Sequence, residues 1–322
     1  MIRSGLLLAL LTLAAPVAAK DLSLGLPIDC TLGENCFVQQ FVDRDAGPDH
    51  SDYSCGSLTY DGHKGTDFAL LNLDAMSSGV DVLAAASGEV VATRNDMPDI
   101  MQGVKGAPDI TNKECGNGLV IKHPGGWETQ YCHLKLGSII VERGQEVAQG
   151  DVLGEIGLSG ETQFPHVHLS VRKDGKVIDP YDADDSLICD GIDLNGLWQA
   201  DMPYVSAGVI SLGFSTAVPK YADVKSGIAR VEALPTDAPA IVLWGYAYGG
   251  RQGDILELLI NGPKGEVIRH QASLEKSQAQ FFRAAGKRNT GAGWPAGHYT
   301  GVVKLMRDAV SLGQRDVSIQ IE

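Results

Sequence analysis

Two short segments of the sequence place side chains that bind metal ions on a common face. His63 and Asp67 are four positions apart, and Gly65 between them argues against a helix. In an extended segment, residues four apart point to the same side, so both side chains can contact one ion. His166 and His168 are two positions apart, which also gives a shared face on a strand. The spacing therefore predicts a metal site built on β-structure.

This grouping of side chains is typical of catalytic zinc. Such a zinc ion commonly has three His, Asp or Glu ligands and one position open to water, whose pKa then falls to about 7. The helical H-E-x-x-H pattern, which brings its own glutamate base, is absent from the sequence. The base must come from elsewhere, and a histidine that is not a ligand is the candidate. His133, at the end of an expected hairpin arm, is a third histidine in a suitable context.

The elements that must position these residues are predicted to be strands. Residues 57–182 contain short β-type runs separated by glycine-rich turns. Apolar and polar residues alternate through 166–171, which predicts a strand with one polar face. Residues 119–121 and 128–132 are the expected arms of a hairpin. The segment 94–114, with two prolines and two glycines, predicts a long loop of the kind that is often functional.

Beyond residue 196 the sequence changes character and predicts a second, all-β domain. It contains no cysteine, and strand-like runs recur at 226–234, 239–248, 254–261, 265–271, 298–306 and 315–321. Short strands separated by turns predict a sandwich of immunoglobulin type. Trp198, Trp244 and Trp294 are expected to anchor a core, and the alternative is that one of them is exposed and stacks on a sugar.

Three motifs in the same order resemble those of the lysostaphin/LytM-type zinc metallopeptidases. They are Gly62-His63-Lys64-Gly65-Thr66-Asp67, Thr129-Gln130-Tyr131-Cys132-His133-Leu134 and Pro165-His166-Val167-His168-Leu169. A glycine-rich run between the last two, residues 144–160, also matches, and the resemblance covers roughly residues 57–182. It implies a small antiparallel β-sheet enzyme with a groove, one bound zinc ion, and the peptides of bacterial cell-wall peptidoglycan as substrate.

The resemblance assigns a role to five side chains. His63, Asp67 and His168 would hold zinc, whereas His133 and His166 would do acid–base work and stabilise the transition state. The implied function is a zinc-dependent endopeptidase of peptidoglycan. One alternative is a non-catalytic regulator of the same fold that activates another wall hydrolase, although such regulators typically lack one or more of these five residues. The other is a carbohydrate- or protein-binding β-protein whose zinc is incidental.

The sequence departs from the pattern of these peptidases in three places. The residue before the middle histidine is usually small, and here it is Cys132. The insertion at 94–114 is longer than the family minimum, so it could reshape the groove. The C-terminal domain does not resemble a familiar wall-binding module, so its role and any protein partner stay open.

Composition and the N-terminus indicate an exported protein. There are 26 basic and 40 acidic residues, and the net charge of −14 argues against nucleic acid or anionic lipid as a partner. Residues 1–19 read as a signal peptide, with Arg3 before an apolar stretch and small residues at 17–19. No later segment is apolar for long enough to span a membrane. We expect a soluble mature protein, in the periplasm or outside the cell.

The cysteines predict three disulfides. The six are Cys30, Cys36, Cys55, Cys115, Cys132 and Cys189. An even number in an exported chain favours oxidised pairs. Cys30 and Cys36 form the easiest local loop. Cys115 and Cys132 flank the expected hairpin, but simple pairing places Leu119 opposite Cys132, so their bond would need a bulge or a bend. Cys55 and Cys189 are the remaining pair.

The resulting division of the chain and the expected surface residues complete the interpretation. We expect a signal peptide at 1–19, an irregular N-terminal segment at 20–56, a peptidase domain at 57–190 and a β-sandwich at 196–322. We expect His123 on the solvated hairpin surface. Asn117 is expected to be a turn residue, or alternatively to line the groove. Asp182, Asp184 and Asp185 are expected to be a solvated charge run rather than a calcium site.

Overall fold

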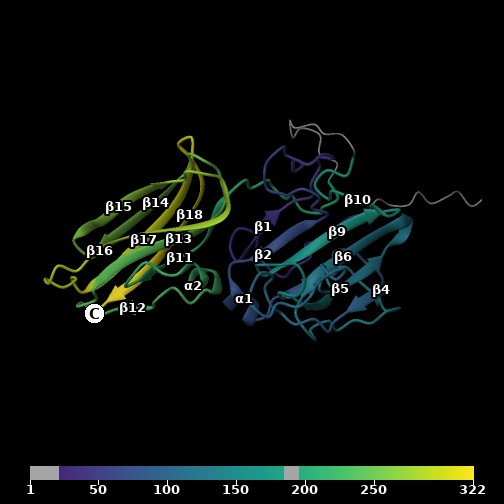
Figure 1. The fold of residues 1–322 in the computed structure, drawn as a ribbon, viewed down its shortest axis with the longest axis horizontal. Coiled ribbons are helices and arrows are strands. Elements are labelled where there is room, and N and C mark those ends of the chain that lie inside the picture. Colours follow the sequence, from purple (N-terminus) through teal and green to yellow (C-terminus); the bar gives the residue numbers. More distant parts are fainter. Residues whose placement is uncertain (1–21, 185–195) are drawn as a thin grey trace, which may run out of the picture.

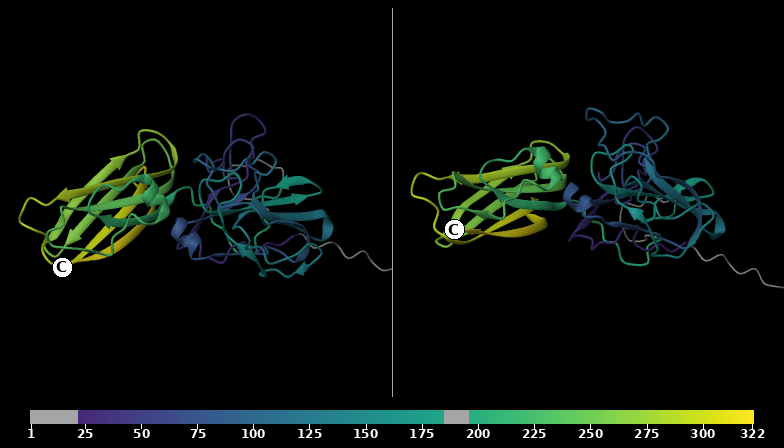
Figure 2. Two further views of the ribbon diagram at one scale, coloured as in Figure 1. Left: turned by 60° about the horizontal axis from the view of Figure 1, so that its bottom comes forward. Right: turned by 90° about the horizontal axis from the view of Figure 1, so that it is seen from below.

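The computed structural model describes residues 22–184 and 196–322, which form two β-rich units side by side (Figures 1 and 2). The expected signal peptide at 1–19 and Cys189 lie outside the described residues. Within them, no helix is long and apolar enough to cross a membrane. The first unit contains the histidine motifs and the second contains the C-terminal strands, so the molecule is almost entirely β-structure, as the sequence predicts.

An antiparallel eight-stranded sheet forms the frame of the first unit. Its order is β1–β2–β9–β6–β5–β4–β7, with β10 paired to the free part of β9. The strands are β1 (Cys36–Gln40), β2 (Thr66–Leu70), β9 (His166–Lys173), β6 (Trp127–Leu134), β5 (Asn117–Lys122), β4 (Gly88–Arg94), β7 (Glu146–Val147) and β10 (Lys176–Ile178). A separate pair, β3 (Asp81–Leu83) and β8 (Val152–Glu155), and the short helix α1 (Leu73–Ser77) complete the unit. The order of the strands in the sheet differs from their order in the sequence. Strands β2 and β9, which are about a hundred residues apart in the sequence, are therefore neighbours in the sheet.

The apolar face of β9 shows why the sheet packs as it does. Val167, Leu169 and Val171 are fully buried in the main core of the first unit. Because side chains alternate along a strand, His166 and His168 project from the other face. The predicted period-two pattern is therefore confirmed, and its polar face is available for chemistry.

The hairpin of β5 and β6 contains the expected bulge, but its register differs from simple pairing. Leu119 faces Tyr131 rather than Cys132, because the pairing shifts between Asn117 and Leu119. Two residues of β6, Cys132 and His133, thus lie opposite the single residue Gly118. The bulge accommodates the Cys115–Cys132 disulfide, whose presence is confirmed, as is that of Cys30–Cys36. Cys55 is also disulfide-bonded.

The second unit is a sandwich of two sheets. The three-stranded sheet is β11 (Gly208–Ser215), β13 (Ala240–Gly250) and β16 (Gln278–Arg288). The five-stranded sheet is β12 (Ala233–Leu234), β18 (Val310–Ile321), β17 (Gly297–Arg307), β14 (Ile255–Gly262) and β15 (Gly265–Ser273). Leu243, Leu258 and Val303 belong to the core between them. The sandwich is as predicted, whereas its likeness to an immunoglobulin domain stays a prediction.

Two details of the second unit were not foreseen. The strand expected at 226–234 is reduced to the two residues of β12, and the helix α2 (Tyr221–Ser226) precedes it. Strand β11 lies in a segment for which no strand was predicted. None of the three tryptophans considered above is exposed: Trp244 is buried, and Trp198 and Trp294 are partly buried. The core-anchoring interpretation of them is therefore supported over sugar stacking.

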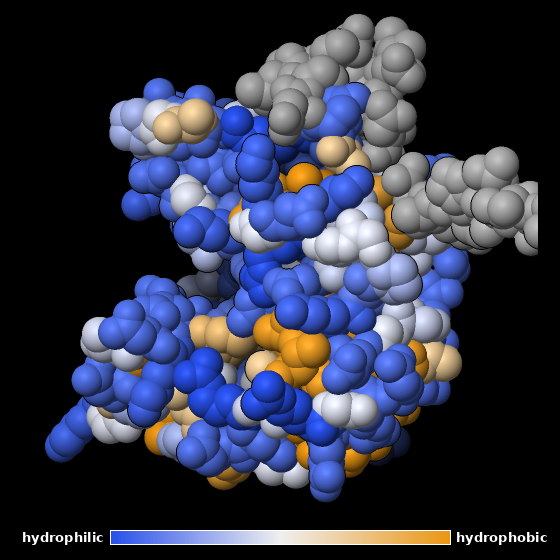
Figure 3. All heavy atoms as spheres, turned by 90° about the vertical axis from the view of Figure 1, so that its right-hand side faces the viewer, coloured by the Kyte–Doolittle hydropathy of each residue, from blue (hydrophilic) through white to orange (hydrophobic). Residues whose placement is uncertain are grey.

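An aromatic cluster joins the two units. Its buried members in the first unit are Phe37, Phe41, Tyr53, Leu58, Ala69, Phe164 and Tyr181, and those in the second are Ile210, Val224, Trp244, Tyr246 and Tyr248. Phe37 and Tyr248 stack with ring centroids 4.5 Å apart. By contrast, the face of the first unit that is turned away from the second is largely hydrophilic, with limited apolar areas (Figure 3). The units therefore meet through a buried apolar contact.

The N-terminal segment is more ordered than expected. Residues 36–40 form β1, an edge strand of the large sheet, so the description of 20–56 as irregular is wrong there. Leu24 exchanges backbone hydrogen bonds with Leu197 and Gln199 at 2.8 and 2.9 Å. The chain just after residue 196 therefore packs on the first unit before it enters the sandwich, whereas the boundaries proposed from the sequence stay predictions.

Candidate metal centre

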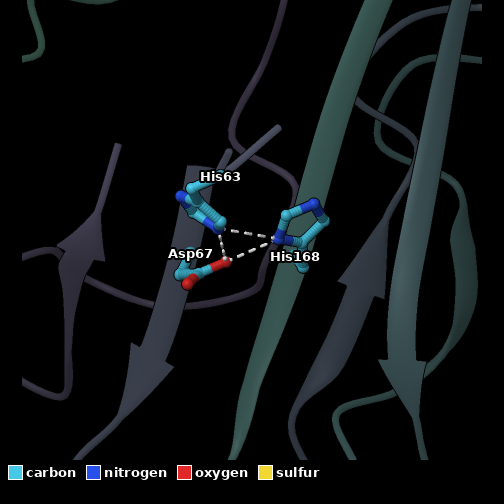
Figure 4. A group of neighbouring side chains, drawn as sticks. All are labelled: His63, Asp67 and His168. Atoms are coloured by element: carbon cyan, nitrogen blue, oxygen red, sulfur yellow. Dashed lines mark hydrogen bonds and ion pairs between the residues drawn. The ribbon is translucent and has the colours of Figure 1, made fainter. Parts of the chain in front are cut away.

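The structure brings together His63, Asp67 and His168 from the first and third motifs (Figure 4). Asp67 on β2 pairs in register with His168 on β9, and His63 lies in the loop before β2. The Asp67 Oδ1 atom is 3.2 Å from His63 Nε2 and 2.8 Å from His168 Nδ1. The two imidazole nitrogens are 3.1 Å apart. Three donor atoms therefore converge on one point.

Backbone and hydroxyl groups fix which nitrogen of each ring faces this point. His63 Nδ1 lies 2.6 Å from the Phe41 carbonyl oxygen, which leaves Nε2 for the cluster. His168 Nε2 lies 3.0 Å from Ser170 Oγ, which leaves Nδ1. Outer hydrogen bonds of this kind orient histidine ligands in metalloproteins. Two imidazole nitrogens and one carboxylate oxygen, all within 4.8 Å of one another, fit a three-ligand metal site.

Gly65 is required by the packing of this centre. A Cβ atom at Gly65 would lie 2.5 Å from His168 Nε2 and 2.7 Å from the Leu169 carbonyl oxygen. Both distances are too short for any side chain, so the glycine between His63 and Asp67 makes room for the His168 imidazole. The H-K-G-T-D motif thus supplies two donors and the space for the third.

The electrostatics of the cluster favour the cation-binding charge states of Asp67 and His168. Burial alone would raise the pKa of Asp67, but the imidazoles of His63, His166 and His168 hold it well below its usual range. Burial lowers the pKa of His168. For His63 the opposing effect of the Asp67 carboxylate outweighs burial and raises the pKa. At neutral pH Asp67 is therefore an anion next to a neutral His168.

His133 lies next to this cluster in a backbone conformation that is uncommon outside glycine. Its φ is +67°, in the left-handed region, at the bulge of β6. Its amide donates to the Cys115 carbonyl at 2.8 Å, and its Nδ1 lies 2.8 Å from the Ser159 carbonyl oxygen. Burial, then the nearby His166 and His168, lower its pKa well below the ordinary histidine value. The ring is thus neutral, held through Nδ1, with Nε2 as a proton acceptor.

His166 is held in the same manner. Its Nδ1 lies 2.7 Å from the Phe164 carbonyl oxygen and 3.2 Å from Thr162 Oγ1. Its Nε2 lies 3.5 Å from Asp67 Oδ1, and its ring centroid is 4.7 Å from that of His133. The two histidines that the sequence analysis did not assign as ligands therefore border the three-residue cluster, and each is held through Nδ1.

A groove of about 560 Å³ opens onto these histidines. Asp67, His133, His166 and His168 line it, together with Tyr60 and residues of the 94–114 insertion and the second unit. The tyrosine ring lies against the ring of His63, with centroids 4.5 Å apart. The arrangement thus combines a metal-binding cluster, two proton acceptors and space for a substrate.

The structure also identifies supporting residues that the sequence analysis missed. Ser159 positions His133 through its carbonyl, and its hydroxyl donates to the Leu134 carbonyl at 2.7 Å. Gly160 is needed nearby, because a Cβ there would lie 2.2 Å from the Glu114 carbonyl oxygen. The glycine-rich run at 157–160 was the available signal, although a glycine pattern alone does not reveal which backbone group it brings close.

Two expectations about individual residues are wrong here, and a third, which concerns Asn117, is described in the next paragraph. His123 is buried rather than solvated, with Nδ1 2.8 Å from the Ser87 carbonyl oxygen and Nε2 2.9 Å from Thr129 Oγ1. Asp182 is buried beside Arg44, whose Nη1 lies 2.9 Å from Asp182 Oδ2, so it is no solvated charge. Asp185 lies outside the described residues.

Asn117 is neither a turn residue nor part of the groove lining. It is fully buried at the start of β5, where its side chain accepts from the Met97 amide at 2.7 Å. Its Nδ2 donates to the carbonyl oxygens of Met97 and Leu134. This amide therefore anchors the start of the 94–114 insertion to the strand that carries His133.

Comparisons with known proteins agree with this geometry. Residues 61–180 match the model of Peptidase family M23. The chain is 34% identical over 102 residues to the cell division protein DipM of Caulobacter vibrioides, covering 32% of this chain and 14% of that protein. It is 32% identical over 116 residues to the peptidoglycan DD-endopeptidase ShyA of Vibrio cholerae, covering 36% of this chain and 21% of that protein. The chain thus spans about a fifth or less of these relatives.

Among solved structures, a SpoIIIAH–SpoIIQ complex contains a similar chain. It is 28% identical, with 49% of this chain and 97% of that chain covered and a TM-score of 0.34. The match to the family model includes all three motifs and the five side chains at the groove. Residues 61–180 therefore resemble Peptidase family M23, in agreement with the resemblance of the three motifs to lysostaphin/LytM-type peptidases.

Proposed function

We propose that this protein is a zinc-dependent endopeptidase that hydrolyses peptide bonds of bacterial cell-wall peptidoglycan. The single observation that carries the proposal is the convergence of His63, Asp67 and His168 beside His133 and His166, at a groove that all of these except His63 line. The relative that is named as a peptidoglycan DD-endopeptidase supports the substrate class. The signal-peptide pattern at 1–19 and the disulfides support export, most simply to the periplasm.

In this proposal, His63 Nε2, Asp67 Oδ1 and His168 Nδ1 hold zinc. Zinc in such a site supplies Lewis-acid polarisation of the peptide carbonyl and lowers the pKa of water. A cation needs an ionised Asp67 and unprotonated ring nitrogens, so His63 gives up any proton when zinc binds, and two nitrogen donors with one oxygen donor suit zinc.

The two remaining histidines move protons. His166 and His133 each have Nδ1 fixed by a carbonyl oxygen, which leaves Nε2 of one of these rings to accept a proton from the attacking water. The imidazolium that results donates this proton to the leaving amine. Because each ring is held through Nδ1, neither has to reorient between these steps.

A second candidate function is regulation of another wall hydrolase without catalysis. The similarity to a cell division protein and to a chain in the SpoIIIAH–SpoIIQ complex favours considering it. All five side chains at the groove are present and oriented, which is unnecessary for a regulator. We therefore favour the enzyme.

The experiment that tests the proposal is digestion of purified peptidoglycan by zinc-loaded protein, with mass spectrometry of the released muropeptides. We expect new peptide termini, which also identify the bond that is cut. Intact wall after incubation with protein that contains one zinc per chain would contradict the proposal. Stimulation of a second hydrolase by the same sample would then support the regulator.

The first variants to test are His63→Ala, Asp67→Ala and His168→Ala. Each removes one of three donors, so we expect each to lower zinc occupancy and abolish wall hydrolysis. Metal content by atomic emission and turnover should be measured on the same samples. His270→Ala, at an exposed position on β15, is a matched control that should retain both. Full zinc content in all three variants would contradict the ligand assignment.

A further inference from the structure

The groove of the candidate centre is walled on one side by the second unit. Its lining includes Tyr221 and Lys225 of helix α2 and Gln280 of strand β16, together with the metal-centre histidines. The C-terminal sandwich therefore contributes side chains to the space where a substrate must lie. Nothing in the histidine motifs predicts this, because they belong to the first unit alone.

The position of this wall is fixed by buried contacts. Phe164, which lines the groove, packs against Tyr246 of the second unit with ring centroids 6.3 Å apart. Helix α2 ends at Gly227, where a Cβ would lie 2.9 Å from the side chain of Asn72, the residue that caps α1 of the first unit. Arg315 donates to the carbonyl oxygens of Gly33 and Glu34 at 2.7 and 2.8 Å. The second unit is thus held against the groove at several points.

Charge is distributed unevenly between the two walls. The first unit contributes Asp67 and Glu161, whereas the second contributes the cation Lys225. Lys225 Nζ lies 5.5 Å from the centroid of the Tyr221 ring, and the part of the chain that the structure describes shows no carboxylate in an ion pair with it. A lysine in a groove with no acidic partner is available for a substrate anion.

Two side-chain amides of the groove each have one atom without a hydrogen-bond partner, although Gln280 Oε1 accepts from the Tyr246 hydroxyl. Gln39 Oε1, an acceptor on the edge strand β1, and Gln280 Nε2, a donor on β16, are both buried without a hydrogen bond. One belongs to the first unit and one to the second. A buried donor and a buried acceptor on facing walls suit a ligand that carries both N–H and C=O groups, as a peptide does.

We propose that the second unit determines substrate specificity, with Lys225 binding a free carboxylate of the substrate peptide while Gln280 and Gln39 bind its backbone. The inference rests on the proposed function for the nature of the substrate. It assigns the C-terminal sandwich a role in the groove rather than in attachment to a distant part of the wall.

The test compares one cross-linked muropeptide, purified to homogeneity, with the same molecule after its carboxylates are amidated. Binding of each is measured by calorimetry to zinc-loaded His166→Ala protein, in which turnover is suppressed, with and without the further change Lys225→Met. We expect the native muropeptide to bind about tenfold more tightly than the amidated one, and Lys225→Met to remove this preference. Lys225→Arg should retain it. Lys264→Met, on the exposed β14–β15 hairpin, is the control and should leave it unchanged.

The outcomes separate this inference from the proposed function. If Lys225→Met retains the full preference for the carboxylate, or if neither form binds, the inference is overturned. Hydrolysis of wall by the otherwise unaltered protein is measured in parallel and decides the proposed function alone. If the protein binds the native muropeptide through Lys225 but hydrolyses no wall, the inference about Lys225 is supported and the proposed enzymatic function is contradicted.

Discussion

At the scale of single residues, the two histidines beside the metal cluster are expected to act on protons rather than on metal. His166→Ala and His133→Asn should therefore retain most of the zinc but lose about 10²–10⁴-fold in turnover. Asparagine is chosen at position 133 because it tolerates the left-handed backbone there better than alanine. Zinc content and turnover on the same preparation are the measurements. Near-normal turnover in either variant would mean that another group transfers the proton.

Gly65 offers a test that removes no ligand. Gly65→Ala places a methyl group 2.5 Å from His168 Nε2, so the ring must shift and its contacts with Asp67 and Ser170 are disturbed. We expect zinc affinity to fall about 10–100-fold, the range seen when ligand orientation is disturbed. Competition with a zinc-binding dye measures this. Gly47→Ala, where the nearest atom is the flexible carboxylate of Asp45, should bind zinc as tightly as the unaltered protein.

The site residues could be predicted because their types and spacing are local in sequence, whereas their supports are not. His63 and Asp67 share a motif, but the carbonyl that fixes His63 belongs to Phe41, twenty-two positions earlier. His123 was misplaced for the same reason, because its partner Ser87 is thirty-six positions away. A histidine is placed on the surface or in the core by such partners, and a single sequence does not show them.

At the scale of elements, the hairpin of β5 and β6 holds His133 by a disulfide across its bulge. Replacing both Cys115 and Cys132 with alanine should lower the free energy of unfolding by about 3 kcal/mol, as expected for a loop of this length. Because the His133 amide also bonds to the Cys115 carbonyl, turnover should fall as well. Chemical denaturation and activity assays measure the two effects. Retention of full turnover would show that the bulge keeps His133 in place without the bond.

The bulge itself could be anticipated from the cysteines, but the edge strand could not. Pairing across the hairpin already conflicted with a Cys115–Cys132 bond, so a distortion was required. The strand β1 gave no comparable signal, because the apolar and polar residues of Cys36–Gln40 do not alternate cleanly. Its pairing with β2 is set by the tertiary structure, where Phe37 and Phe41 become buried in the aromatic cluster.

At the scale of the whole molecule, the junction between the two units could not be predicted from the sequence. Phe37 and Tyr248 are more than two hundred positions apart, and each taken alone is an unremarkable apolar residue of a strand. The sequence analysis treated residues 196–322 as a separate β-sandwich domain. The buried aromatic cluster argues instead for cooperation, because separation would expose side chains that both units now cover.

This coupling makes a calorimetric prediction. With a shared buried cluster, the full chain should unfold in a single transition, since neither unit loses the contact without cost to the other. Tyr248→Ala removes a ring that is 5% exposed and stacked on Phe37, so it should cost about 3–5 kcal/mol and separate the transition into two. Val310→Ala, at a residue that is 63% exposed and is no member of the buried aromatic cluster, is the control and should leave a single transition. The unaltered protein could instead show two well-separated transitions whose midpoints do not change in Tyr248→Ala. That result would mean that the units fold independently. The contacts that hold the sandwich against the groove would then be weaker than the structure implies.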